Sequence, residues 1–137
     1  MIMTKNIPNE FLPFWRATRE GHLNFPKCDD CGRFHWYPHK LCPFCQSNNI
    51  RWTRVNGRGK IFSWTVVRYP FDPSFSDKIP YIVATVVFED APGVRLVTNI
   101  IDVEPDEIEI GMGVKNVFCR INDDTTLVVF RPVKIGT

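Results

Sequence analysis

Four of the five cysteines in this sequence form two pairs with the spacing of metal ligands. The first pair is Cys28 and Cys31, the second is Cys42 and Cys45, and two residues separate the members of each pair. Two such pairs can surround one ion tetrahedrally, which is the ligand set of a structural zinc site. Four protein ligands leave no open coordination position, so we expect the metal to stabilise the fold and not to catalyse.

Two other uses of these cysteines can be compared with the zinc site. A thioredoxin-like dithiol would place one pair at the start of a helix within a strand–helix–strand unit, and the residues around Cys28 and Cys42 do not have that pattern. A rubredoxin-type iron would use the same four thiolates, and zinc is favoured over it by ligand type alone. The histidines at 22, 35 and 39 are not needed as ligands, because four cysteines complete the coordination shell.

Charge is distributed unevenly along the 137 residues, although the formal net charge is only +2. Residues 1–60 contain ten Lys and Arg against four Asp and Glu, whereas residues 61–137 contain seven against eleven. The first part therefore offers a modest basic surface that suits phosphate groups. Proteins that bind nucleic acid usually carry a stronger basic patch, so a single-stranded nucleic acid is the alternative and not the preferred partner.

Cysteine usage and the lack of long apolar runs indicate a cytoplasmic protein. No apolar run approaches 18 residues, and the first residues do not have the basic-then-apolar order of a signal peptide. Reduced thiols that hold a metal are typical of the cytosol. The fifth cysteine, Cys119, lies in an apolar run on the side of Val117 and Ile121, which predicts a buried free thiol.

An amphipathic helix is predicted within the N-terminal segment, residues 1–24. Apolar residues at helical spacing over 8–22 place Phe11, Phe14 and Trp15 on one face. Such a face either covers the core of its own chain or docks a partner, and both interpretations remain open.

The remainder of the chain is predicted to be a zinc ribbon at 25–56 and a barrel at 57–137. Runs rich in Val, Ile, Phe, Thr and Tyr predict five strands. These runs lie at 58–69, 80–89, 93–102, 113–122 and 125–133. A helical turn between Pro105 and Gly111 follows the third run, and Gly59 stands where a strongly coiled strand can bend. The chain is therefore expected to be mainly β with an OB-fold barrel, because the nearest rival, an SH3-like barrel, would not need the inserted turn.

The order of these features resembles a family of formerly uncharacterised proteins that join a rubredoxin-like zinc ribbon to an OB-fold. The resemblance extends from about residue 11 to residue 132. Besides the cysteines, the segments that carry it are Phe14-Trp15, Gly57-x-Gly59-x-x-x-Ser63-x-Thr65, Pro80-Tyr81, Gly93-Val94-Arg95-Leu96 and Ile110-Gly111-Met112. The turn at 88–93 is somewhat longer than is common in the family.

This resemblance implies a partner. Members of the family accompany thiolase-like acyl-CoA enzymes, so a non-catalytic zinc-binding subunit of a hetero-oligomeric acyl-CoA thiolase or acyltransferase complex is implied. Such a subunit supports the catalytic thiolase-fold subunit, which forms or cleaves a C–C bond, and it helps to hold the CoA moiety of the substrate. An acyl-CoA aldolase or hydratase complex is the alternative, because nothing in this chain distinguishes these partners.

Two sets of residues are candidates for contacts with CoA and with the partner subunit. CoA carries phosphate groups, which basic side chains near the predicted barrel mouth and the ribbon–barrel junction would bind. The CoA candidates are Arg54, Arg58, Lys60, Arg68, Lys78 and Arg95. The loop at 68–81 is long for a strand connection and carries apolar residues without an evident core. The docking candidates are Phe11, Phe14 and Trp15 in the helix and Phe71 and Phe75 in this loop.

Overall fold

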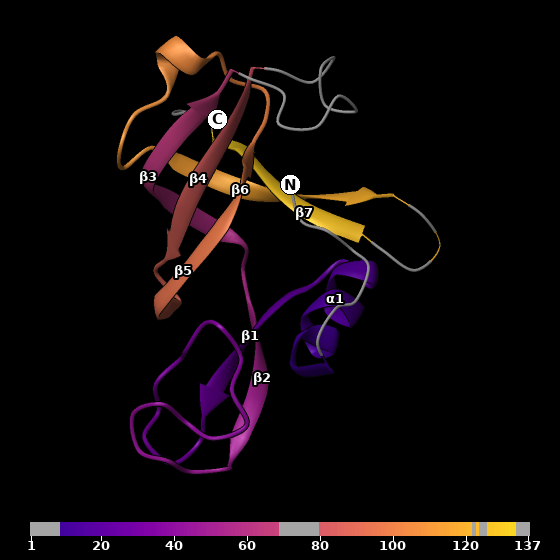
Figure 1. Cartoon of the computed structure of the whole chain (residues 1–137), viewed down its shortest axis with the longest axis vertical. Coiled ribbons are helices and arrows are strands. Elements are labelled where there is room, and N and C mark those ends of the chain that lie inside the picture. Colours follow the sequence, from indigo (N-terminus) through magenta and orange to yellow (C-terminus); the bar gives the residue numbers. More distant parts are fainter. Residues whose placement is uncertain (1–8, 69–79, 122, 124–125, 134–137) are drawn as a thin grey trace.

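A short helix, a two-stranded hairpin and a closed barrel follow one another along the chain (Figure 1). The computed structural model describes residues 9–68, 80–121, 123 and 126–133. Its elements are η1 (Asn9–Phe11), α1 (Leu12–Arg19), β1 (Leu23–Cys28), β2 (Ile50–Val55), β3 (Arg58–Val67), β4 (Tyr81–Phe88), β5 (Ala91–Ile100), η3 (Pro105–Glu107), β6 (Gly113–Arg120) and β7 (Thr126–Pro132). The hairpin and the barrel lie at opposite ends of the long axis, and α1 lies beside the hairpin and close to β7.

The N-terminal helix is shorter than the sequence pattern predicts. Pro13 lies in the first turn of α1, where its missing N–H leaves no hydrogen bond unmade. Gly21, at φ +84°, follows the end of the helix, where a left-handed residue is favourable. Among the residues that the structure describes, no helix is long and apolar enough to cross a membrane.

The hairpin brings the two cysteine pairs together. β1 and β2 are antiparallel, and their register pairs Leu23 with Val55 at one end and Cys28 with Ile50 at the other. The first cysteine pair therefore begins at the last residue of β1, and the second pair precedes β2. The hairpin starts at Leu23, slightly before the ribbon boundary expected at residue 25.

The barrel confirms the predicted OB-type layout. Its strands are ordered β3-β4-β5-β7-β6, and β6 pairs with β3 to close the barrel. All pairs are antiparallel except β5 and β7, which meet in parallel at Ile100 and Phe130. The helical turn η3 lies between β5 and β6, where the insertion is expected, and the five predicted runs coincide with the five barrel strands.

Closure of the barrel depends on glycine in β3. A Cβ atom at Gly59 would lie 2.5 Å from Cγ1 of Val86 and 2.7 Å from the carbonyl oxygen of Val87. Only a residue without a side chain lets β3 approach β4 this closely. A bulge between Ile61 and Ser63 then shifts the register of the same strand, as is common where strands coil.

One continuous hydrophobic core connects the helix, the hairpin and the barrel. The ring of Phe25 in β1 lies 5.3 Å from Trp36 and 5.2 Å from Phe88 of β4, and Phe88 lies 5.8 Å from Phe130 of β7. This chain of aromatic rings runs from the ribbon into the barrel. The ribbon and the barrel therefore share buried surface and are not independent modules.

Strand β7 is buried on both faces. Every residue from Thr126 to Phe130 is buried, although alternate residues of a strand point in opposite directions. The barrel interior covers one face, and α1 packs against β7, where the hydroxyl of Thr18 donates a hydrogen bond of 2.9 Å to the carbonyl oxygen of Thr126. The helix therefore covers the outer face of β7.

The predicted burial of Cys119 is wrong. Its side chain is exposed, and so is that of Ile121. The reason is the register of β6: Val114 points into the core, so the odd-numbered positions Lys115 and Cys119 lie on the outer face.

Candidate functional site

The four predicted ligands converge at the end of the hairpin distant from the barrel. Their Sγ atoms all lie within 4.8 Å of one another, and the Cys28–Cys45 and Cys31–Cys42 separations are both 3.6 Å. A tetrahedron with Zn–S bonds of about 2.3 Å has sulfur–sulfur edges of about 3.8 Å, so one metal ion fits between these sulfurs. The separations are much longer than a disulfide bond of about 2.05 Å, and all four cysteines are free.

Two backbone turns aim the sulfurs at this point. The N–H of Gly32 donates to the carbonyl oxygen of Cys28 at 2.9 Å, and the N–H of Gln46 donates to that of Cys42 at 2.9 Å. Gly32 and Gln46 both have a positive φ, +76° and +67°, so the second turn uses a glutamine where the first uses glycine. The N–H of Phe44 also donates to Sγ of Cys42 at 3.4 Å, which stabilises a thiolate.

Crowding of the thiols makes the site dependent on a cation. Burial raises the pKa of Cys42, but backbone N–H groups of Cys45 and Phe44 and the neighbouring thiols lower that pKa to about 7. The N–H of Ser47 favours the thiolate of Cys45, yet burial and the three other thiols together raise the pKa of Cys45 to about 12. The cluster therefore cannot carry four negative charges alone at neutral pH, whereas a bound divalent ion offsets their repulsion.

Two aspartates of the first turn, Asp29 and Asp30, contact β2 and the residues that precede it. The carboxylate of Asp30 accepts hydrogen bonds from the hydroxyl of Ser47 and, at 2.9 Å, from the amide of Asn49. These two hydrogen bonds lower the pKa of Asp30. Arg51 forms an exposed ion pair of 2.9 Å with Asp29. Polar contacts between residues that are not metal ligands thus also hold the two turns in position.

The histidines have no part in the cysteine cluster found among the described residues. His35 is only 4% exposed, and neither ring nitrogen has a hydrogen-bond partner within the described part of the chain. Burial, and to a lesser extent the nearby His39, lower the pKa of His35, so its ring is neutral at pH 7. Its backbone N–H donates to the carbonyl oxygen of Pro26 at 3.1 Å, which holds the residue as part of the ribbon's packing.

The predicted CoA-binding residues do not form one cluster. Arg54 belongs to β2 of the hairpin, Arg58 opens β3, and Arg68 follows the other end of β3. Because strands rise about 3.3 Å per residue, the opposite ends of this ten-residue strand are too far apart to meet one phosphate. Lys78 lies outside the described residues.

Two of the CoA candidates share one side of the barrel. The register pairs Lys60 with Val87 and Val87 with Arg95, so the two cations lie on one row of β3, β4 and β5 and on the outer face. The guanidinium carbon of Arg95 lies 4.4 Å from the ring centroid of Phe62, which is 46% exposed. An exposed aromatic ring in contact with one cation, with a second cation in the same row as the first, is a surface suited to an anionic, planar ligand.

Two of the predicted docking residues are part of the core instead. Phe14 and Trp15 are 2% and 8% exposed, so they are not available to a partner. The hairpin is too small to bury its own aromatics, and α1 covers them: the ring of Phe14 lies 5.0 Å from Trp36. Phe11 is half-buried and lies 5.7 Å from the same indole. The other two docking candidates, Phe71 and Phe75, lie outside the described residues.

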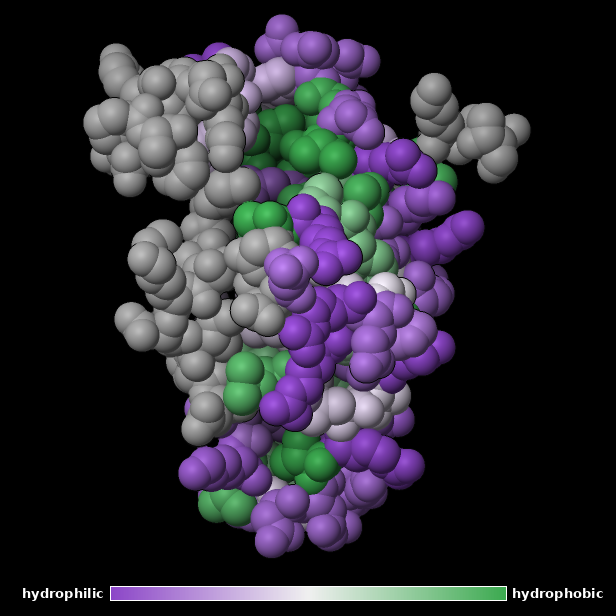
Figure 2. Space-filling model, turned by 90° about the vertical axis from the view of Figure 1, so that its right-hand side faces the viewer, coloured by the Kyte–Doolittle hydropathy of each residue, from purple (hydrophilic) through white to green (hydrophobic). Residues whose placement is uncertain are grey.

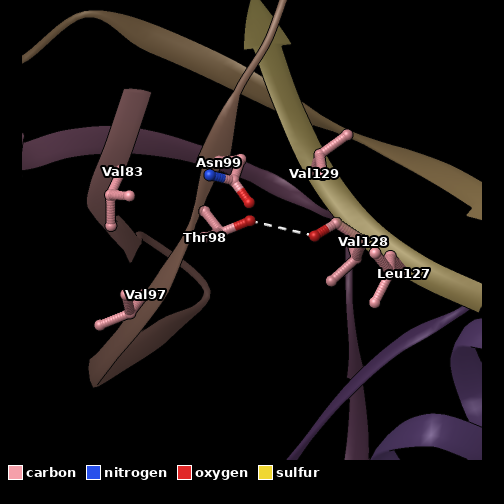
Figure 3. A pocket seen from close by; sticks show the side chains of 7 residues that line it. All are labelled: Val83, Val97, Thr98, Asn99, Leu127, Val128 and Val129. Atoms are coloured by element: carbon pink, nitrogen blue, oxygen red, sulfur yellow. Dashed lines mark hydrogen bonds between the residues drawn. The ribbon is translucent and has the colours of Figure 1, made fainter. Parts of the chain in front are cut away.

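Two hollows lined by described residues bear on ligand binding. A hollow of about 50 Å³ lies between β5 and β7 and is lined mainly by aliphatic side chains, with Thr98 donating to the carbonyl oxygen of Val128 at 3.0 Å across it (Figure 3). This volume is too small for CoA, because sites for ligands of that size exceed about 300 Å³. A second, open cleft of about 370 Å³ lies between the start of the helix and the ribbon, among three prolines, Trp52, His39 and Lys40.

One face of the molecule is mainly hydrophilic. In Figure 2, hydrophilic side chains run down the centre of the view, and the larger hydrophobic areas lie above and below them. Sequence patterns did not identify Lys115 and Arg131 as members of any site. The structure places them directly opposite one another on β6 and β7. The one available signal was their charge within two runs of strand-forming residues.

Comparisons with known proteins match both parts of the chain. Residues 15–51 match the family described as the ChsH2 rubredoxin-like zinc ribbon domain, and residues 52–119 match the ChsH2 C-terminal OB-fold domain. A solved chain of the Ltp2-ChsH2(DUF35) aldolase has a TM-score of 0.83 and 33% identity, covering 93% of this chain and 97% of that one.

Two curated proteins are also similar. A DUF35 domain-containing scaffold protein of Pyrococcus furiosus is 35% identical over 144 aligned positions, which cover 92% of this chain and 95% of that protein. A probable enoyl-CoA hydratase alpha subunit of Thermomonospora curvata is 37% identical over 120 positions, 87% of this chain. This chain spans 36% of the length of the Thermomonospora protein.

Proposed function

This chain belongs to the ChsH2/DUF35 family of zinc-ribbon and OB-fold proteins, and from that membership we propose that it is a non-catalytic scaffold subunit of an acyl-CoA enzyme complex. The observation that carries the proposal is the likeness to the solved DUF35 chain of an aldolase, which extends over nearly the whole of both chains. The architecture agrees with this role. Four thiolates close the metal shell, so the metal has no free position for a substrate.

The catalytic partner in this proposal is a thiolase-fold subunit that forms or cleaves a C–C bond of an acyl-CoA. One related structure is named an aldolase, and one related protein is named an enoyl-CoA hydratase subunit. These names support a catalytic partner of the lyase type or one that acts on an acyl-CoA, and they do not decide the reaction. The chemistry belongs to the partner. An aldolase or hydratase subunit in the same position is the alternative, since the scaffold would use the same surfaces.

The scaffold also contributes to CoA binding in this proposal. Lys60 and Arg95 are the two predicted cations that share a row on the outer face, with Phe62 stacked against the Arg95 guanidinium. Two cations in one row, one of them in contact with an aromatic ring, suit the phosphates and adenine of CoA. Reversing both charges, Lys60→Glu with Arg95→Glu, is expected to raise the KM of the complex for acyl-CoA about tenfold, and kcat should change less.

The first test is purification of the tagged protein from its host at low salt, with mass spectrometry of the co-purified proteins and an acyl-CoA cleavage assay on the eluate. A thiolase-fold protein in equal amount, with activity in the eluate, is the expected result. Recovery of the chain alone, or with nucleic acid, would contradict the proposal. A matched control for the KM measurement is Arg16→Glu with Lys40→Glu, which also reverses two exposed cations, one in α1 and one in the ribbon, outside the row of Lys60 and Arg95.

A further inference from the structure

Three cations form a single row across three strands of the barrel. Arg131 of β7 pairs with Lys115 of β6, and Lys115 pairs with Arg58 of β3, so the three residues are direct cross-strand neighbours. All three side chains are exposed, on the outer face, because the adjacent positions Gly59, Val114 and Pro132 form the neighbouring inward row. We call Arg58, Lys115 and Arg131 the basic row.

The basic row is unfavourable for the isolated chain. Side chains directly opposite one another on neighbouring strands have Cβ atoms about 4.5–5.5 Å apart, and like charges at that distance destabilise the pair. Among the described residues, none of the three cations has an ion pair or a hydrogen-bonded acidic neighbour. Two of its members, Lys115 and Arg131, lie in the part of the sequence where acidic residues outnumber basic ones, whereas Arg58 belongs to the basic part. A partner that carries negative charge would remove the repulsion.

We propose that the basic row docks a carboxylate-rich surface of the catalytic partner subunit. The proposal rests on the scaffold function proposed above and adds the place and the chemistry of the contact. Three guanidinium or ammonium groups spread over about 10 Å, the width of three strands, match carboxylates on a protein surface.

The shape of the site favours a protein over a small ligand. The basic row stands on the outer face of the barrel, and the two hollows described above are lined by other residues. A small ligand is bound by enclosure of most of its surface, whereas a protein partner meets an open face. Single-stranded nucleic acid is less suited, because its binders combine a cationic groove with exposed aromatic platforms. The exposed ring of Phe62 lies against Arg95 and is not a member of the basic row.

The experiment compares partner binding by two variants that change charge equally. The test variant is Lys115→Glu with Arg131→Glu, and the control is Arg16→Glu with Lys40→Glu. Circular dichroism and metal content establish that both variants fold. The dissociation constant of each chain with the purified partner is then measured at several salt concentrations. The test variant is expected to bind at least about tenfold more weakly and to lose most of the salt dependence, whereas the control should bind like the unchanged chain.

A second variant separates charge from packing. Lys115→Arg keeps the cation and should retain the affinity of the unchanged chain. Unaltered binding by the folded Lys115→Glu/Arg131→Glu variant would overturn the proposal for the basic row and leave the scaffold function intact. An increase in the KM for acyl-CoA without weaker partner binding would also overturn it, in favour of a phosphate contact. If the unchanged chain itself binds no catalytic subunit, both the scaffold function and this docking site are wrong.

Discussion

The ribbon and the barrel differ in where their apolar side chains lie. Leu41 and Phe44, beside the metal ligand Cys42, are 49% and 55% exposed, whereas Val86 and Phe130 in the barrel are completely buried. The tip of the ribbon therefore buries two of its four ligand cysteines, Cys28 and Cys42, and leaves large apolar side chains exposed, whereas the barrel buries a conventional core. The difference indicates that metal binding supplies the folding free energy at one end of the molecule and hydrophobic burial supplies it at the other.

The two ends are nevertheless connected. Phe25 belongs to the ribbon's hairpin but packs its ring against Phe88 of the barrel, and α1 covers both the hairpin and β7. Loss of the metal or of barrel core packing should therefore weaken the other region at the shared aromatic rings without unfolding it completely. The following changes test that relation, beginning with the largest expected effect.

Replacing one metal ligand should disrupt the ribbon. Cys42→Ser is expected to reduce the bound metal from about one ion per chain to nearly none, because structural zinc sites contribute about 10–16 kcal/mol of binding free energy that an incomplete thiolate set does not provide. Elemental analysis after gel filtration measures the metal, and near-ultraviolet circular dichroism reports the order of Trp36 and Trp52. The control is Cys119→Ser, an exposed cysteine outside the cluster, which should keep its metal. Full occupancy in Cys42→Ser would refute the ligand assignment.

Removing a central barrel side chain should destabilise the barrel and leave the metal site occupied. Phe130→Ala is expected to lower the free energy of unfolding by about 3–5 kcal/mol, since it leaves a cavity in a fully buried site. Denaturant unfolding measures this loss. Metal content should remain near one ion per chain, because the ribbon's ligands are untouched. Val97→Ala, at a 48% exposed position, should cost less than about 1 kcal/mol. Loss of metal in Phe130→Ala would show that the ribbon depends on the barrel.

A smaller loss of stability is expected at Gly59, where β3 lies closely against β4. Gly59→Ala should destabilise the protein by about 1–3 kcal/mol, because the new Cβ would meet Val86 and the backbone of Val87 at less than 3 Å. Gly113→Ala is the matched control, since nothing lies within 4 Å of a Cβ at that position. Equal unfolding midpoints for the two variants would show that β3 adjusts without cost.

The smallest effect concerns the second metal-binding turn. Gln46→Gly should stabilise the metal-bound ribbon by up to about 1 kcal/mol, because glycine adopts a φ of +67° without the steric cost that glutamine bears. Competition with a chelator measures the change as a modest increase in metal affinity. The converse variant, Gly32→Ala, has open space around its new Cβ and should weaken the site by a similar amount through the backbone alone. Unchanged affinity in both would show that the turns tolerate either residue.

Much of this molecule follows from local features of the sequence. The spacing of Cys28, Cys31, Cys42 and Cys45 predicted a four-thiolate site, and the structure brings their sulfurs within 4.8 Å of one another. Runs of β-branched and aromatic residues predicted the five barrel strands, with a helical turn after the third. Ligand chemistry and strand propensity depend on residue type and short spacing, so the chain itself specifies them.

The neighbours of each side chain were decided only by the tertiary structure. The aromatic face of the helix was compatible with a core or with a docking surface, and packing against Trp36 and Phe25 placed Phe14 in the core. Cys119 is exposed because the register of β6 assigns its position to the outer face. The basic row exists because barrel closure aligns β3, β6 and β7, whose cations are distant in sequence. Register and closure are non-local properties, and a shift of one residue reverses the faces of a strand, so no local pattern determines them.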